Sequence, residues 1–134
     1  MKPKIIVDDD LLLGVYIGSR SLERKFRYAS QRALLPDSNY FLLATKSVNE
    51  RGQVIGLKYG DYGLHVVYLS PTERVRVLLP QRGYESIAEA ATAYRHRHYQ
   101  VPSWFNGTAG KPFERIGAVV IQSQFRGRNI VEIL

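Results

Sequence analysis

The chain has 134 residues, 45% of them hydrophobic and 23% charged, which are ordinary values for one globular domain with its own core. Its net charge of +7 favours a polyanionic partner. It has no cysteine, which excludes disulfides and thiolate metal sites and favours an intracellular, cytoplasmic protein. No apolar run approaches the roughly 18 residues of a membrane span, and the acidic start is unlike a signal peptide, so we expect no membrane association.

The positive charge is spread along the chain. Basic residues exceed acidic residues by two in 1–50, by three in 51–99 and by two in 100–134. A cationic patch would therefore have to be created by folding.

The N-terminal part of the chain, 1–50, predicts an extension built of short strands. They are expected at Ile5–Val7, Leu11–Ile17, Phe26–Ala29 and Tyr40–Ser47. The three aspartates at 8–10 are interpreted as a solvated turn rather than a metal site, because neighbouring strand residues point to opposite faces. Residues 49–53 form a loop that ends this extension.

Residues 54–99 predict a central unit of three strands followed by one helix. The strands are expected at 54–60, 64–70 and 74–80. The turn at 60–63 predicts a hairpin between the first two strands, and the turn at 70–73 leads into the third.

The expected helix has a clear start and one apolar face. Ser86 and Glu89 have the spacing of a capping box, and Pro102 lies beyond the end of the helix. The residues spaced for one face are small or apolar: Ile87, Ala90, Ala91 and Tyr94. Small alanines would let the helix lie close against a sheet.

The C-terminal part, 116–134, predicts a hairpin that extends or covers the sheet. Its strands are 116–124 and 129–134, and its tip carries Arg126 and Arg128, which suit either a phosphate clamp or a charged turn. In the preceding loop, Trp104 and Phe105 are interpreted as core residues, with base stacking or a surface for a protein partner as the alternatives. The predicted fold is therefore α+β, a single domain with an antiparallel β-sheet packed against one principal α-helix and additional strands at both ends.

Alternation along the strands predicts a cationic sheet face. Val75 and Val77 point to one side of the third strand. If the helix covers that side, four polar or basic residues share the open face: Lys58, Tyr68, Arg74 and Arg76. Such a sheet can enter the major groove of DNA, where arginine binds guanine or phosphate. The alternative is a solvated face whose arginines oppose edge-to-edge aggregation.

The central unit resembles the apetala/ethylene-response-factor type of DNA-binding domain. The residues that carry the resemblance are Gly56–Lys58, Gly63–Leu69, Arg74–Val77 and, most closely, Tyr84–Tyr94, which follows the family's F/Y-x-S/T-x-x-E-A-A-x-A-Y helix pattern. The resemblance covers about a third of the chain. It implies a three-stranded antiparallel sheet packed on one helix and docked in the major groove. By position, it implies base or phosphate contacts at Lys58, Tyr68, Arg74 and Arg76.

Further cations would support such binding. We expect Arg82, Arg95 and Arg97 to contact the DNA backbone. Cations at 95–98 also relieve the dipole of a helix C-terminus, which is the competing interpretation. His96 and His98 are two residues apart and cannot jointly ligate a metal from one helix face.

The sequence offers no recognisable catalytic motif. It contains no phosphate-binding loop, no dinucleotide fingerprint and no H-E-x-x-H pair, so we expect neither an enzyme nor a cofactor. The favoured function is a small DNA-binding protein of regulatory or mobile-element (phage) type, with duplex DNA as its partner. The alternative is a non-enzymatic protein–protein interaction module, and RNA binding is compatible with the same residues. Nothing in the sequence indicates an oligomeric state.

Overall fold

The computed structural model describes residues 3–7, 13–17, 20–23, 27–29, 46–48, 54–101, 103–107, 110–122 and 131–134. Within these ranges the chain forms eleven strands, one α-helix and one 3₁₀ helix. In chain order they are β1 (Lys4–Val7), β2 (Leu13–Ile17), β3 (Arg20–Glu23), β4 (Arg27–Ala29), β5 (Lys46–Val48), β6 (Val54–Gly56), β7 (Tyr62–Leu69), β8 (Val75–Leu78), β9 (Gly83–Tyr84), α1 (Ile87–Arg95), η1 (Ser103–Asn106), β10 (Glu114–Gln122) and β11 (Val131–Ile133).

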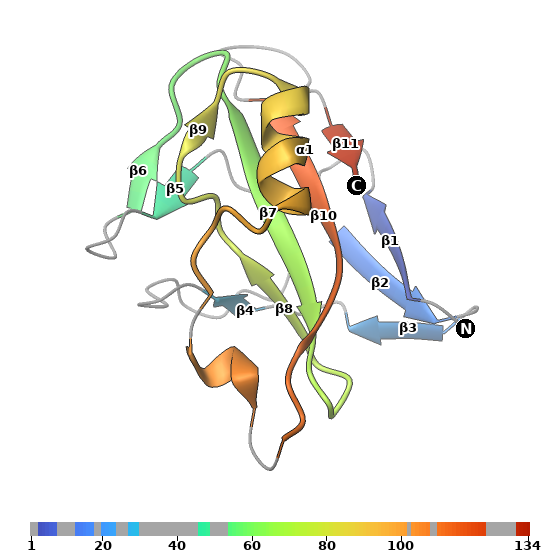
Figure 1. The fold of residues 1–134 in the computed structure, drawn as a ribbon. Coiled ribbons are helices and arrows are strands. Elements are labelled where there is room, and N and C mark those ends of the chain that lie inside the picture. The colour runs from blue at the N-terminus through green and yellow to red at the C-terminus, as the bar shows by residue number, and fades with distance from the viewer. Residues whose placement is uncertain are drawn as a thin grey trace.

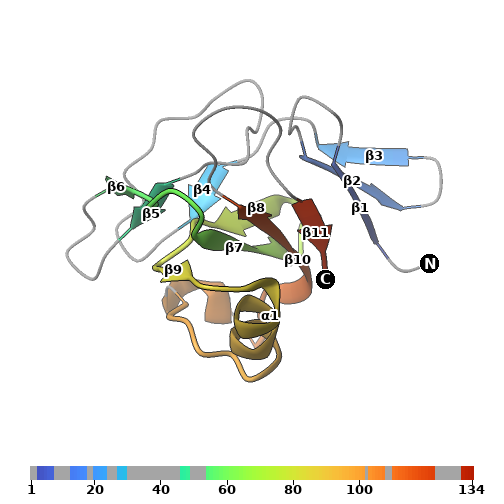
Figure 2. The ribbon, with the colours of Figure 1, turned by 90° about the horizontal axis from the view of Figure 1, so that it is seen from above.

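The main sheet has six strands in the order β11-β10-β7-β8-β4, with β9 paired to the start of β7. Its pairs are antiparallel except for β4 and β8, which run parallel. A second sheet has the order β1-β2-β3, and β5 pairs with β6. Helix α1 lies across β7 and β10 in Figure 1, and Figure 2 shows it on the side of the main sheet opposite to β1, β2 and β3. The predicted α+β fold with one principal helix is confirmed.

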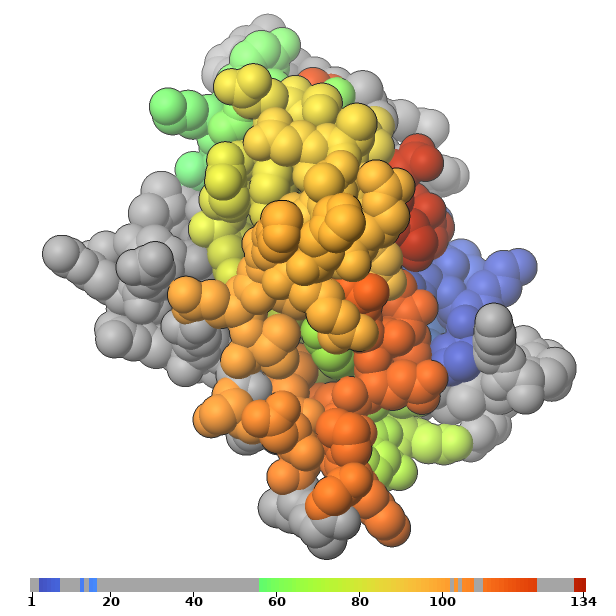
Figure 3. Space-filling view, viewed as in Figure 1, coloured from blue at the N-terminus to red at the C-terminus, as the bar shows by residue number. Residues whose placement is uncertain are grey.

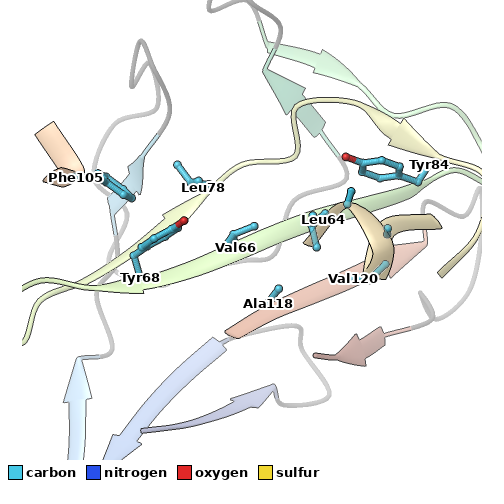
Figure 4. Packing of buried hydrophobic residues seen from close by; sticks show 10 residues of the cluster. Leu64, Val66, Tyr68, Leu78, Tyr84, Phe105, Ala118 and Val120 are labelled. Atoms are coloured by element: carbon cyan, nitrogen blue, oxygen red, sulfur yellow. The ribbon is translucent and has the colours of Figure 1, made fainter. Parts of the chain in front are cut away.

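The central strand β7 is buried on both of its faces. Leu64, Val66 and Tyr68 point into a cluster with α1, whereas Val67 and Leu69 point into a cluster with β1 and β2. Figure 4 shows the helix-side cluster, in which β7 side chains lie beside residues from β8, β10 and the chain near η1. Burial on both sides explains why β7 is apolar nearly throughout instead of alternating with polar residues.

The predicted orientation of the sheet relative to the helix is wrong. Helix α1 packs against the face that carries Tyr68 and Leu78, not against the face of Val75 and Val77. Both faces present apolar side chains, so the alternation of β8 alone could not decide between them. The Val75 and Val77 face is instead covered from the other side by apolar residues of the first two strands: Ile5, Leu13 and Val15.

The predicted hairpin between the first two central strands is also wrong. Strand β6 pairs with β5, and the edge of β7 that was expected to receive it pairs with β10. The β7–β10 ladder joins eight residue pairs, from Glu114 opposite Leu69 to Gln122 opposite Tyr62, with one irregularity between Arg115 and Gly117. A nine-residue apolar strand offers a far longer ladder than the three residues of β6. The three-strand order implied by the family resemblance is therefore not the order in this sheet.

The flanking strands are partly as expected. Strands β2 and β4 lie within the predicted segments, β1 begins one residue before the predicted Ile5–Val7, and β5 overlaps only the end of the predicted Tyr40–Ser47 strand. Strand β3 was not predicted. Strands β10 and β11 pair antiparallel as expected for the C-terminal hairpin. Five predicted features lie wholly or mostly outside the described residues: the aspartates at 8–10, residues 40–45 of the predicted strand, the loop at 49–53, the hairpin tip with Arg126 and Arg128, and the side chain of Trp104.

The start of α1 confirms the capping prediction. Ser86 Oγ accepts a hydrogen bond of 3.1 Å from the Glu89 N–H, and Glu89 Oε2 accepts one of 3.2 Å from the N–H of Glu85. The helix lies close to the sheet because its buried positions are the small residues Ala90 and Ala93. Of the expected stripe, Ala90 is buried, while Ile87 and Tyr94 pack at the margin of the same cluster.

Candidate functional site

Tyr68 cannot take part in the predicted DNA contact. Its side chain is only 4% exposed and lies beneath the helix layer. Its hydroxyl is 3.1 Å from the Tyr99 hydroxyl, and its ring meets Phe105 edge-on at 5.0 Å. Burial, followed by the hydrogen bond and charge of Tyr99, raises the pKa of Tyr68 above its usual value. Tyr68 is a core residue with a satisfied hydroxyl.

The other predicted sheet contacts do not converge on one open face. Lys58 is exposed before β7 and Arg74 is exposed after it, so the two lie near opposite ends of an eight-residue strand that spans roughly 26 Å. Arg76 pairs across the sheet with Tyr68 and is half-buried, and its Nη1 donates to the carbonyl of Val75 at 2.9 Å. The predicted cationic sheet face is therefore not formed, because the helix layer covers that side of the sheet.

A cluster of exposed basic residues does form at the C-terminal end of α1. Arg95 is in the last helical turn, His96 is the C-cap, and Arg97 and His98 follow. The Arg97 N–H donates to Tyr94 O at 3.3 Å and the His98 N–H donates to Ala93 O at 2.8 Å. These two bonds define a Schellman motif, which satisfies helix-end carbonyls and turns the chain sharply.

Arg97 occupies the position of this motif where glycine is usual. Its φ of 55° lies in the left-handed region, which costs a residue with a side chain about 1 kcal/mol. The turn leaves all four side chains from Arg95 to His98 exposed. The sequence prediction that Arg95 and Arg97 are surface cations at a helix end agrees with this arrangement.

Arg82 lies across a surface hollow from this helix. Its guanidinium carbon is 5.0 Å from the centre of the Tyr84 ring, its Nη2 is 3.8 Å from Glu89 Oε1, and its Nε donates to Gly83 O at 3.4 Å. The hollow has a volume of about 360 Å³ and is lined by Arg82, Tyr84, Ala88, Glu89, Thr92, Ala93 and His98. Thr92 also accepts a hydrogen bond of 3.3 Å from Arg95 Nη2.

The hollow and the helix end therefore form one surface. We call Arg82, Arg95, His96, Arg97 and His98 the helix-end surface. Figure 3 views the molecule from this side, with α1 and the chain that follows it spread over the centre of the face. Glu89 lies in the first turn of α1, where its carboxylate is beside Arg82, whereas Arg95 to His98 lie at the other end of the helix.

Arg115 holds the helix end against the sheet. Its Nη1 donates to the carbonyl of Tyr94 and, at 3.0 Å, to the Tyr99 hydroxyl, and its guanidinium carbon lies 4.0 Å from the centre of the Tyr94 ring. A cation at the last helical carbonyls also opposes the helix dipole. Sequence reasoning missed Arg115 and Tyr99, because nothing in the local pattern indicates that β10 passes beneath the end of α1.

Other candidate sites have structural explanations. His65 is a completely buried residue of the core. Phe105 is buried and stacks on Phe113 at 4.7 Å, which confirms its assignment to the core. Among the side chains that the structure describes, no three of His, Cys, Asp or Glu are grouped to hold a metal ion. No helix in the described ranges is long and apolar enough to cross a membrane.

The resemblance to the apetala/ethylene-response-factor type of domain stays a prediction. No protein-family model, curated protein sequence or solved structure matches this chain.

Proposed function

We propose that this protein binds nucleic acid, with DNA as the first candidate, through the helix-end surface. The observation that carries the proposal is the exposure of Arg82, Arg95 and Arg97 around one helix, together with the exposed His96 and His98. Arginine is well suited to phosphate because its planar guanidinium donates two parallel hydrogen bonds. The net charge of +7 would attract a polyanion over a longer range.

This mode of binding differs from the sheet docking suggested by the sequence. Contacts to phosphate position a protein on nucleic acid without reading its sequence. Phosphate contacts from Arg95 and Arg97 predict a modest and salt-sensitive affinity, with a slope of log K against log salt of about −2. The left-handed backbone conformation of Arg97 supports the proposal. An arginine is less stable than glycine in this conformation, so its presence there is explained if the side chain has a role in binding.

The test is a fluorescence anisotropy titration of a generic labelled duplex at salt concentrations from 50 to 200 mM. The variant Arg95→Gln/Arg97→Gln should weaken binding and reduce the salt slope by about 2. The matched control, Lys58→Gln/Arg74→Gln, removes the same charge from the two ends of β7 and should leave most of the affinity intact.

Each other result has a definite meaning. Equal losses in the two double variants would show that net charge, and not the helix-end surface, drives binding. If only the control variant lost affinity, the nucleic acid would contact Lys58 and Arg74, as the sequence predicted. No binding to duplex DNA, single-stranded DNA or RNA at 50 mM salt would overturn the proposal and favour the protein–protein interaction module.

A further inference from the structure

The hollow beside α1 combines an apolar wall with a polar rim. Its apolar lining comes from the exposed Ala88 and from the mostly buried Ala93 and Tyr84, whose ring lies beneath the Arg82 guanidinium. Its rim carries a donor, Arg82, and an acceptor, Glu89, next to each other. A volume of about 360 Å³ falls at the lower end of the range for small-ligand sites. The hollow therefore suits one flat ring system with hydrogen-bonding groups on its edge.

The donor and the acceptor are both held in place before any ligand arrives. Arg82 is restrained by the Tyr84 ring and by the carbonyl of Gly83. Glu89 is restrained through Oε2, which accepts the N–H of Glu85. The distance of 3.8 Å between Arg82 Nη2 and Glu89 Oε1 is too long for a hydrogen bond, so a ligand edge can engage both groups. Preorganisation of this kind lowers the entropy lost on binding.

The carboxylate of Glu89 argues against a bare phosphate as the occupant. A phosphate beside Glu89 would meet a like charge, whereas a nucleobase offers both N–H donors and ring acceptors. Arginine pairs with ring nitrogen and carbonyl acceptors of bases, and glutamate accepts from the amino group of cytosine or adenine. In a duplex, pairing already occupies most of these groups, so the base that fits is unpaired.

We propose that the hollow holds one unpaired, amino-bearing nucleobase of a nucleic-acid strand, cytosine or adenine in preference to thymine. Arg82 donates to a ring acceptor, Glu89 accepts from the exocyclic amino group, and the exposed Ala88 packs against the ring. His98 lines the same hollow toward the C-terminal end of α1, which brings the strand's phosphates to Arg95 and Arg97. This assignment rests on the proposed function.

The experiment compares labelled single strands of equal length and charge: oligo-dC, oligo-dA, oligo-dT and a fully abasic strand. The affinity for each strand is measured by fluorescence anisotropy at one salt concentration. The protein should bind oligo-dC and oligo-dA about tenfold more tightly than the abasic strand. The affinity for oligo-dT should lie between the affinities for oligo-dC or oligo-dA and the affinity for the abasic strand. Equal affinities for all four strands would overturn the base site and leave phosphate binding standing. No binding to any strand, nor to a duplex, would overturn the proposed function itself.

Two variants place the base in this hollow rather than elsewhere on the molecule. Glu89→Gln keeps an oxygen to accept the Glu85 N–H but loses the carboxylate, so the preference for oligo-dC over the abasic strand should fall severalfold. Glu85→Gln removes the same charge from an exposed neighbour and should preserve that preference. Ala88→Tyr fills the hollow from an exposed helix position and should abolish the preference for oligo-dC over the abasic strand. A preference unchanged in both Glu89→Gln and Ala88→Tyr would overturn the assignment.

Discussion

The guanidinium carbon of Arg115 lies 4.0 Å from the centre of the Tyr94 ring, and the same side chain donates to the Tyr94 carbonyl. This contact joins β10 to the end of α1 and brings in Tyr99, whose hydroxyl meets both Arg115 and Tyr68. The part of the helix-end surface from Arg95 to His98 therefore projects from a turn that is fastened to the sheet. A half-buried cation here has a structural role, whereas its exposed neighbours Arg95 and Arg97 remain available for a ligand.

Replacing Arg115 should destabilise the fold. We expect Arg115→Met to lower the free energy of unfolding by about 2 kcal/mol, since it removes a cation–π contact and two hydrogen bonds at partly buried groups. Urea denaturation followed by circular dichroism measures the change. Lys111→Met, at an exposed site four residues earlier, should change stability by less than about 0.5 kcal/mol. Equal effects of the two substitutions would contradict the anchoring role.

Arg97 should show opposite effects on stability and on binding. Arg97→Gly relieves the left-handed backbone at φ 55° and should raise the free energy of unfolding by about 0.5–1 kcal/mol. The same change removes a guanidinium from the helix-end surface, so affinity for duplex DNA should fall. Urea denaturation and anisotropy, run on the same samples, test both effects.

The control for this prediction is Glu73, which also has a positive φ, of 60°, in the turn between β7 and β8. Glu73→Gly relieves the same kind of backbone conformation without removing a cation, so it should not weaken binding. If Arg97→Gly destabilised the protein or left affinity unchanged, the proposed role of Arg97 would be wrong.

The capping bond of α1 should be measurable in isolation. Ser86→Ala removes the acceptor for the Glu89 N–H and should cost about 1 kcal/mol of stability. Ser86→Asp keeps an oxygen at the same position and should restore most of that loss. Chemical denaturation of the three proteins provides the comparison, and a neutral Ser86→Ala would show that water replaces the cap at no cost.

Tyr68 should make the fold sensitive to alkaline pH. Because burial raises its pKa in the folded state, the unfolded chain releases this proton first, near pH 10. The stabilisation is therefore complete below about pH 10 and is lost as pH rises through the higher folded-state value. Urea midpoints measured between pH 8.5 and 11 should decline, and Tyr68→Phe should reduce the slope of that decline. Tyr59→Phe, at a well-exposed ring, serves as the control.

Local features of the sequence predicted local features of the fold. The S-x-x-E spacing placed the start of α1 at Ser86, since the capping bond joins residues only three apart. The turn after β7 is closed as expected, by the Glu73 N–H bonded to Ser70 O at 2.9 Å. Exposed cations at Arg95 and Arg97 were also predictable, because polar residues beyond the apolar stripe of a helix lie at the surface.

The hollow was not predictable from sequence. Its lining comes from the chain around β9, from α1 and from the turn after it, and Arg82 meets Glu89 only because Tyr84 pairs with Tyr62 at the start of β7. No spacing rule relates a strand of two residues to a neighbouring helix face. The same limit applied to Arg115, whose partners are 16 and 21 residues away.

By itself, the sequence determined the α+β class, the capped helix, the apolar strands and the cations near the helix end, because each depends on neighbouring residues. Only the tertiary structure decided that β10 and not β6 pairs with β7, and that α1 packs on the sheet face that carries Tyr68 and not on the face of Val77. The physical reason is that both faces of the sheet are apolar, so the choice depends on which distant segment gains the longer ladder and the better burial. That choice buried Tyr68 of the expected sheet contact and, among the described residues, placed a group of exposed cations at the helix end.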